Sequence, residues 1–305
     1  MKLWLSMIIK NEEKNIKKYL YDIYDLFDDV VVVDTWSTDS SIELLNAIWI
    51  KAIQYELVHK DERLIEARNF SIEHNTCDWI LIMDWDEYIS REDIKKIKDM
   101  ESDCFNHSAS GYFIKRLDHR YNDPFEDYKM CLINKNYVRF LFSVHACPQV
   151  YIRDNGWTWL WMNGVTLHHY PEVREYKLKY IEQLENWIKE NPWCLRFYRF
   201  LWYYYFKHDK IPEAISKFKF MIQQSNSRYP VEILNSIMML SYISYLSWDT
   251  IKTFCYISLW LEYYETIKED FEIKINFRLK KRFVDSQQKL IENPEAIIVP
   301  YEFAY

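Results

Sequence analysis

Residues 79–88 read Trp-Ile-Leu-Ile-Met-Asp-Trp-Asp-Glu-Tyr. The first five are apolar and long enough for one buried strand, and the carboxylates Asp84, Asp86 and Glu87 follow at once. In an open α/β sheet, ligands bind beyond the carboxyl ends of the strands. Neighbouring carboxylates repel one another, so a divalent cation with oxygen ligands would explain them. The alternative is a polar strand end with helix capping, which needs no ligand.

Two similar apolar runs, residues 3–9 and 30–33, precede this stretch. Continuous runs of this length are typical of parallel strands that are covered on both faces. Between them, apolar residues recur at helical spacing, with Asn11 as the expected N-cap of the first helix. Residues 40–43 and 90–93 have the spacing of capping boxes for later helices. This β-α-β-α order predicts an α/β, Rossmann-like sheet that is mixed but mostly parallel.

The remaining chain divides into two regions. Residues 105–170 contain short strand-like runs at 112–114, 138–142 and 149–152, which predict an antiparallel or mixed extension of the sheet. From about residue 171 the pattern is helical, and residues 209–215 are similar to the start of the second helix of a tetratricopeptide repeat. A plain helical bundle is the alternative. We therefore expect an α/β domain over residues 1–170 and an all-α domain over residues 171–305.

Composition narrows the class of protein. With 305 residues, 49% of them hydrophobic, the chain can form a large core. Its six cysteines form no C-x-x-C pair, which argues against a disulfide framework or zinc site and for a reducing compartment. The first apolar run is too short for a secretory signal, and no run reaches membrane length, so we expect a cytoplasmic protein with at most peripheral membrane contact. The net charge of −7 disfavours nucleic-acid binding.

Four stretches then occur in a fixed order. They read Leu-Ser-Met-Ile-Ile-Lys-Asn-Glu-Glu from residue 5, Val-Val-Val-Asp-Thr-Trp-Ser-Thr-Asp from 31, Ala-Arg-Asn-Phe from 67, and Cys-Asp-Trp-Ile-Leu-Ile-Met-Asp-Trp-Asp-Glu from 77. Together they resemble the family 2 glycosyltransferases of GT-A fold, and more narrowly the subgroup whose first strand ends in K-N-E-E. The resemblance covers residues 1 to about 170. It implies a GT-A domain that binds a nucleotide sugar.

The resemblance also implies roles for individual residues. The ends of the first two strands would contact the nucleotide, and the D-x-D pair would hold the metal ion and the pyrophosphate. A late histidine, within Leu-His-His-Tyr at 167–170, would be the third protein group on the ion. Because imidazole is a more natural ligand for Mn²⁺ than for Mg²⁺, Mn²⁺ is the preferred ion. The residues are Lys10, Asn11, Glu13 and Asp34 for the nucleotide, and Asp84, Asp86 and His169 for the metal.

Arg68 has a physical argument of its own. It is in helical register with Leu64, Ile65 and Ile72 on the apolar face of its predicted helix. An unpaired charge on that face is costly, so a partner is expected, either the nucleotide or an active-site carboxylate. A surface arginine that extends its head into water is the alternative.

Two departures from the family pattern affect the site. Trp36 stands where the family usually has glycine, so a turn that needs positive φ would be strained there unless the loop takes another path. Ala146 replaces the glutamate of a Val-His-Glu sequence, and alanine cannot deprotonate an acceptor hydroxyl. The remaining candidates for the general base are Glu126, Asp127 and His145.

The leading hypothesis is a metal-dependent inverting glycosyltransferase that uses a nucleotide sugar, UDP-hexose by preference, and a glycan, lipid-linked, protein or small-molecule acceptor. The alternative is a glycosyltransferase-like module that has lost turnover and binds a partner through its helical domain. A nucleotidyltransferase would usually have a glycine-rich, basic loop after the first strand, where this chain has Asn11-Glu12-Glu13.

Overall fold

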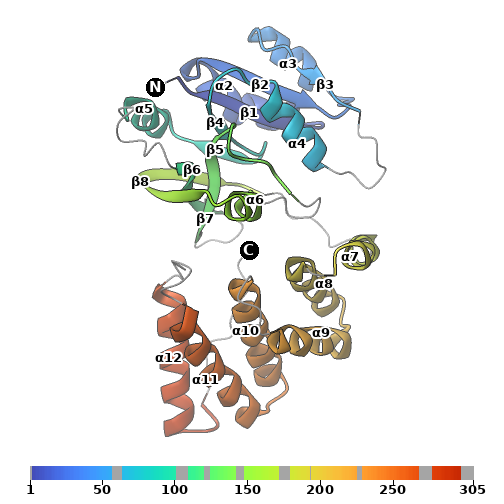
Figure 1. The fold of residues 1–305 in the computed structure, drawn as a ribbon, viewed down its shortest axis with the longest axis vertical. Helices are drawn as coiled ribbons and strands as arrows, with labels where there is room; N and C mark the ends of the chain where they lie inside the picture. Colours follow the sequence, from blue (N-terminus) through green and yellow to red (C-terminus); the bar gives the residue numbers. More distant parts are fainter. Residues whose placement is uncertain are drawn as a thin grey trace. The chain divides into compact units, whose positions relative to one another are not determined.

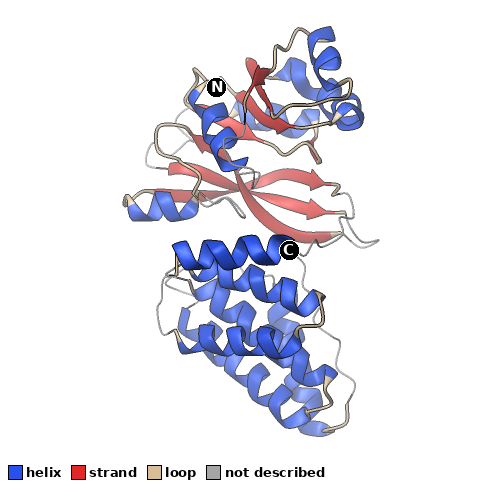
Figure 2. Cartoon of the chain, turned by 90° about the vertical axis from the view of Figure 1, so that its right-hand side faces the viewer, coloured by secondary structure: helices blue, strands red, loops and turns tan. Residues whose placement is uncertain are grey.

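The computed structural model describes residues 2–56, 64–100, 109–119, 124–141, 148–171, 179–192, 194–224, 229–267 and 277–296. The chain forms two compact units, Met1–Val173 and Arg174–Tyr305. The first unit is a sheet with helices and the second is helical (Figures 1 and 2). Each unit has its own hydrophobic core. The fold is therefore α/β followed by an all-α region, as predicted.

The first unit is built on an eight-stranded sheet in the order β3-β2-β1-β4-β7-β6-β8-β5 (Figure 1). The pairs β1–β2, β1–β4, β2–β3 and β6–β8 are parallel and the other three pairs are antiparallel, which confirms a mixed, mostly parallel sheet. The strands are β1 Trp4–Ile9, β2 Asp29–Asp34, β3 Ile53–Gln54, β4 Trp79–Ile82, β5 Glu87–Ile89, β6 Ala109–Asp118, β7 Phe125–Asn134 and β8 Thr158–His169.

The three apolar runs of the sequence are neighbouring parallel strands. β1 lies between β2 and β4, and Ile9 is opposite Asp34 in the β1–β2 register. The central residues of all three strands are buried, because helices cover both faces of this part of the sheet. Their carboxyl ends consequently meet at one edge, where the K-N-E-E segment, Asp34 and Asp84 follow.

The extension of the sheet differs in detail from the expected strands. Residues 149–152 were expected to be a strand, but they belong to α6, Gln149–Asp154, whose N-cap is Pro148. Proline has a φ suited to helix entry, and this favours the helix. Residues 138–140 also lie in no strand. The side chain of Asn69 instead accepts a hydrogen bond from the Phe140 amide and donates one to its carbonyl, both at 3.0 Å.

The helices of the first unit test the predicted caps. Ser90 Oγ accepts a hydrogen bond from the Asp93 amide at 3.1 Å, which confirms the cap of α5. Ser40 is the N-cap residue of α3, as predicted, but its side chain makes no capping bond, and the buried Ser41 binds the Glu12 amide. Asn11 is not the cap of α1, whose N-cap residue is Glu12. The longer helices are α3 Ser41–Ala47, α4 Leu64–Glu73 and α5 Arg91–Asp99. Residues 13–26 form four short helical segments, α1 Glu13–Asn15, a π-helical turn Ile16–Leu20, α2 Tyr21–Ile23 and a 3₁₀ turn Tyr24–Leu26.

The second unit is a series of helices in which each described helix packs on the next along the chain (Figure 2). Pro212 and Pro230 stand in the first turns of α9 and α10, as expected from their positions. Aromatic side chains pack among aliphatic ones in the interior, where Phe283 stacks on Trp260 with ring centres 4.1 Å apart. The tetratricopeptide assignment stays a prediction. The helices are α7 Lys179–Glu190, α8 Leu195–Lys207, α9 Ile211–Gln223, α10 Pro230–Leu246, α11 Thr250–Ile267 and α12 Phe277–Glu292.

Candidate active site

The register of β4 and β7 places a lysine opposite the first carboxylate of the acidic cluster, Asp84, Asp86 and Glu87. These strands are antiparallel, with Trp79 opposite Asn134. When this register is continued past the end of β4, Lys129 falls opposite Asp84. Lys129 Nζ indeed lies 2.6 Å from Asp84 Oδ2. β7 therefore extends beyond β4 and carries a cation to the cluster.

The other side of the cluster is set by β6, β8 and β5. β6 places Arg116 opposite Asp127, and its last residue, Asp118, opposite His169 of β8. The edge strand β5 then places Glu87 opposite His169. Residues 83–86 thus cross from the middle of the sheet to its far edge, because β4 and β5 are not neighbours. Groups from four strands, β5 to β8, therefore converge with those of the crossing segment.

Asp84 is paired with two cations. Arg68 Nη2 binds Asp84 Oδ1 in a short ion pair, and Lys129 binds the other oxygen. The Arg68 side chain is only 13% exposed, and its Nη1 atom is buried without a hydrogen-bond partner among the described residues. The partner expected for an inward arginine is therefore Asp84, and one of the guanidinium donors has capacity for another acceptor.

Glu87 is fully buried beneath this ion pair. Its two carboxylate oxygens lie 2.7 and 2.6 Å from Lys129 Nζ, and Oε2 also accepts the Asp84 amide at 2.8 Å. Arg116 approaches Glu87 at 3.8 Å and binds Asp127 with two hydrogen bonds of 2.8 and 2.5 Å. Burial of charge is costly unless it is compensated in this way. Glu87 thus fixes Lys129 and closes the turn that carries Asp84.

The protonation of these carboxylates differs. Burial alone would raise the pKa of Asp84, but Lys129 and Arg68 hold it far below its ordinary value. Burial raises the pKa of Glu87, and the charge on Asp84 adds to that effect against the opposing charge of Lys129. Asp84 is consequently an anion at any physiological pH.

Asp86 and His169 form the second half of the cluster. His169 Nε2 lies 3.3 Å from Asp86 Oδ2, and His169 Nδ1 lies 3.1 Å from Asp118 Oδ2. Burial alone would lower the pKa of His169, but its hydrogen bonds to Asp118 and Asp86 raise it to about 9. The structure thus brings together two of the three predicted metal ligands and leaves Asp84 with its two cations. Within the described residues, no three His, Cys, Asp or Glu side chains surround one common ion position.

The ends of β1 and β2 are connected by side chains of the K-N-E-E segment. Asn11 Oδ1 accepts the Thr38 amide at 2.7 Å, and Glu13 Oε2 accepts the Ser40 amide at 3.3 Å. Asp34 is buried and accepts hydrogen bonds from Ser37. Lys10 is exposed. Of the four residues predicted to contact the nucleotide, Asn11 and Glu13 therefore link the two loops, and Asp34 holds the turn of its own loop.

Trp36 adopts the strained conformation considered from the sequence. Its φ is 67°, in the left-handed region that favours glycine. The Ser37 amide that follows donates to the Asp34 carboxylate, which holds the turn. The Trp36 side chain is 58% exposed. The loop thus keeps the path of a glycine turn and places an indole beside it.

The general-base candidates lie in different places. Successive residues of β7 point to opposite faces, so Asp127 shares the face of Lys129 and Glu126 points to the other face. There Glu126 pairs with Lys115 at 2.9 Å. Both oxygens of Asp127 are bound by Arg116. His145 lies outside the described residues, as does Ala146.

Sequence reasoning missed Lys129, Arg116 and Asp118. All three stand in long strands and project toward the cluster. A signal was present in β7, where Asp127 and Lys129 alternate with other residues in a strand whose later part is apolar. Charged residues at every second position, followed by a buried apolar run, indicate that one face of the strand lines a polar site at its start and packs in the core at its end.

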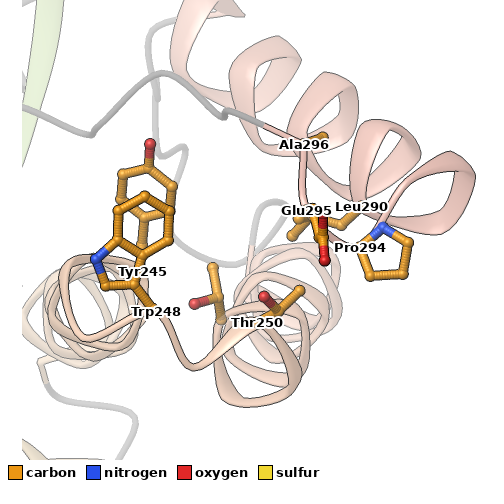
Figure 3. Close-up of a pocket in the computed structure, with 8 residues that line it drawn as sticks. Tyr245, Trp248, Thr250, Leu290, Pro294, Glu295 and Ala296 are labelled. Carbon is orange, nitrogen blue, oxygen red and sulfur yellow. The ribbon is translucent and has the colours of Figure 1, made fainter.

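A separate pocket lies in the helical unit, between the start of α11 and the segment that follows α12 (Figure 3). Trp248 and Leu290 contribute apolar surface, and Glu295 is the charged side chain of the lining. No cation stands among its described lining residues, so nothing there marks a site for a diphosphate. No helix in the described part of the chain is both long and apolar enough to cross a membrane.

Comparison with known proteins finds a family match over part of the chain. Residues 5–135 match the profile of glycosyl transferase family 2. The SPbeta prophage-derived glycosyltransferase SunS of Bacillus subtilis is 30% identical over 151 residues, 48% of this chain and 34% of SunS. An uncharacterized glycosyltransferase of Rickettsia typhi is 26% identical over 197 residues, 61% of this chain and 63% of its own. The chain thus spans about a third of the length of SunS.

Among solved structures, S. aureus TarS 1–349 in complex with UDP-GlcNAc superposes with a TM-score of 0.46 at 14% identity, over 89% of this chain and 92% of that one. The family match runs from β1 to the end of β7 and includes the acidic cluster. Over residues 5–135 the chain is therefore similar to glycosyl transferase family 2.

Proposed function

We propose that this chain is a metal-dependent, inverting glycosyltransferase that moves a hexose from a UDP-sugar to an acceptor hydroxyl. The observation that carries the proposal is the Asp86–His169 pair, 3.3 Å apart, beside the inward-facing Arg68. The family match over residues 5–135 suggests the class of reaction. The clustered charges suggest where a diphosphate would be held.

Asp86 and His169 are suited to hold a divalent ion. Neighbouring ligands of an octahedral ion are about 3 Å apart, since each lies about 2.1 Å from it, and the Asp86 and His169 atoms have nearly this spacing. A carboxylate with an imidazole suits Mn²⁺ better than Mg²⁺, which is the alternative. Two protein ligands are enough, because such ions commonly bind waters and substrate phosphates as well. The ion would stabilise negative charge on the departing diphosphate as a Lewis acid.

Arg68 supplies a permanent positive charge for the donor. In this arrangement Arg68 neutralises Asp84, and its buried Nη1 has no described acceptor. A phosphate oxygen would satisfy that donor. We infer that Arg68 exchanges Asp84 for a phosphate oxygen when the donor binds, while Lys129 keeps its partner Glu87. Asp84 would then become available as the third metal ligand.

The two loops after β1 and β2 would form the wall of the nucleotide pocket. Lys10 is exposed and stays the candidate for direct contact. Asn11, Glu13 and Asp34 would act by holding the loops, since their side chains already bind backbone amides across or within them. The donor base and ribose would therefore meet a preformed surface.

Asp127 is the best placed of the described base candidates, because it shares the face of Lys129. To accept a proton from the acceptor it would have to release one oxygen from Arg116. Glu126, on the opposite face, would then be dispensable, and His145 stays a prediction. The acceptor is a glycan, a lipid-linked or protein hydroxyl, or a small molecule. A cytoplasmic location, no nucleic-acid partner and at most peripheral membrane contact belong to the same proposal.

One observation favours the second candidate function, a binding module without turnover. Both oxygens of Asp84 are paired with cations of the chain itself, and Lys129 is held by Glu87 as well. A site already neutral in this way has less need of a metal ion. On this alternative, the nucleotide sugar would bind through Arg68 and Lys129 and would not be consumed.

The test is titration of the purified full chain with several UDP-hexoses, with and without Mn²⁺, followed by thermal unfolding and by slow hydrolysis of the donor. The variants are Asp86→Asn and, as the matched control, Asp78→Asn, an exposed aspartate directly before β4. We expect Mn²⁺-dependent stabilisation by one UDP-hexose and its hydrolysis. Both should be lost in Asp86→Asn and retained in Asp78→Asn.

Two results would contradict the enzyme. Stabilisation of equal size without Mn²⁺, with no hydrolysis or transfer, would favour the binding module. The absence of any response to nucleotide sugars would exclude both functions. For the base, Asp127→Asn should abolish transfer while donor binding persists, and Glu126→Gln should leave both unchanged.

A further inference from the structure

His169 is held between two carboxylates, one at each ring nitrogen. Nε2 faces Asp86 at 3.3 Å and Nδ1 faces Asp118 at 3.1 Å. The strand register explains this, because the last residue of β6, Asp118, pairs with His169 at the end of β8. The imidazole therefore has two distinct sides, toward the cluster and toward β6.

The two carboxylates differ in where they lie. Asp86 stands in the turn after β4, next to Asp84, at the mouth of the proposed metal site. Asp118 is a strand residue whose side chain is 3% exposed, against 11% for Asp86. Asp118 is thus too enclosed to touch a donor or acceptor, and it can influence the reaction only through the groups it contacts.

A neutral imidazole has one protonated and one unprotonated nitrogen, and only the latter can bind a metal. Metal-binding histidines generally donate the other N–H to a carboxylate or carbonyl, which fixes the tautomer and the ring orientation. We propose that Asp118 is a positioning residue that accepts the Nδ1–H of His169 and so presents its Nε2 to the metal ion. This inference rests on the metal-dependent function proposed above.

The neighbouring histidine provides a matched comparison. His168 lies beside His169 in β8, but its Nδ1 is 2.9 Å from His119 Nε2. Alternation along the strand points His168 to the opposite face. Substitution of His168 should therefore alter the same strand without altering the metal site.

The test measures the Mn²⁺ affinity of the full chain without donor, from the electron paramagnetic resonance signal of the free ion. The proteins compared are the wild type and the variants Asp86→Asn, Asp118→Ala, Asp118→Asn and His168→Gln. Loss of the hydrogen-bond acceptor behind a metal-binding histidine typically costs about 10–100-fold in metal affinity, and we expect Asp118→Ala to fall in that range. Asp118→Asn should lose less, because its amide oxygen can still accept the Nδ1–H. His168→Gln should bind as the wild type does.

A spectroscopic measurement separates positioning from a general structural defect. Electron spin-echo modulation of bound Mn²⁺ should show the coordinated imidazole nitrogen in the wild type and in Asp118→Asn, and a weakened signal in Asp118→Ala. If Asp118→Ala does not fold, a fully retained signal and affinity in Asp118→Leu would contradict the inference. Retained Mn²⁺ affinity in Asp118→Ala, with loss in Asp86→Asn, would overturn the role of Asp118 alone. No Mn²⁺ binding by the wild type, either alone or with a UDP-hexose present, would overturn the proposed function as well.

Discussion

Trp36 and Trp49 have the same backbone conformation in different surroundings. Their φ angles are 67° and 62°, but Trp36 is 58% exposed and Trp49 is 96% exposed. Trp49 follows α3, where its amide binds the Asn46 carbonyl and the Ile50 amide binds the Leu45 carbonyl, the arrangement in which glycine usually stands. Replacing each tryptophan by glycine therefore separates backbone strain from side-chain burial.

The two glycine substitutions should change the free energy of unfolding in opposite directions. A left-handed conformation costs a non-glycine residue about 1–2 kcal/mol, and the flexibility of glycine in the unfolded chain costs about 0.5–1 kcal/mol. Trp49→Gly should therefore raise the free energy of unfolding by roughly 0.5–1 kcal/mol, since almost no side-chain surface is buried. Trp36 buries about two fifths of a side chain of roughly 200 Å², worth about 2 kcal/mol at ~25 cal/mol per Å². In Trp36→Gly this lost burial exceeds the relieved backbone strain, so the free energy of unfolding should fall by about 1 kcal/mol.

Both substitutions lie in the first unit, so denaturant unfolding followed by circular dichroism reports the same transition for each. Trp49→Ala is the control, because alanine retains the Cβ atom and should give no gain. A loss of stability in Trp49→Gly, or a shift of equal sign and size in both glycine variants, would refute the reasoning.

Three further variants test other parts of the chain. Burial alone would raise the pKa of Asp28, but the Leu3 amide and Lys98 hold it below its ordinary value. The stabilising effect of Asp28 is therefore present above about pH 4 and is lost as the pH falls further. In acid titrations, the difference in unfolding free energy between the wild type and Asp28→Asn should shrink between pH 6 and pH 3. Ser90→Ala removes the cap of α5 and should lower the free energy of unfolding by about 1 kcal/mol in denaturant titrations, whereas no change would exclude a stabilising cap. Phe283 is fully buried against Trp260, so Phe283→Ala should destabilise the second unit by about 3–5 kcal/mol, and a calorimetric transition that stays unchanged would contradict this.

Much of the sheet was predictable because its signals are local. Each of the apolar runs that became β1, β2 and β4 is continuous, and the side chains that follow them identify the binding edge. The strain at Trp36 was also readable, since the turn after Asp34 needs a conformation that only glycine adopts freely. These predictions required no knowledge of distant contacts.

The partners of the acidic cluster were not predictable in this way. Lys129 reaches it through the register of β7 on β4, and Asp118 through the register of β6 on β8, and these strands are far apart in the sequence. One residue of slip would turn each side chain to the other face. The helix at 149–154 was missed because a short apolar run fits a strand or a helix equally well. The capping bond expected from the Ser40 side chain is not formed, and the next residue, Ser41, accepts a hydrogen bond from the Glu12 amide in the loop after β1.

The crossing at residues 83–86 has a consequence for the order of folding. The three carboxylates of the acidic cluster lie early in the chain, in this crossing and at the start of β5. Lys129 is 45 residues beyond Asp84, and His169 is later still. As the chain leaves the ribosome, β1, β2 and β4 are complete before any of those later groups has been made. Of the two cations that bind Asp84 in the described part of the chain, Arg68 alone has been made during that interval. The carboxylates then repel one another, so this edge should stay open to water until β7 pairs with β4.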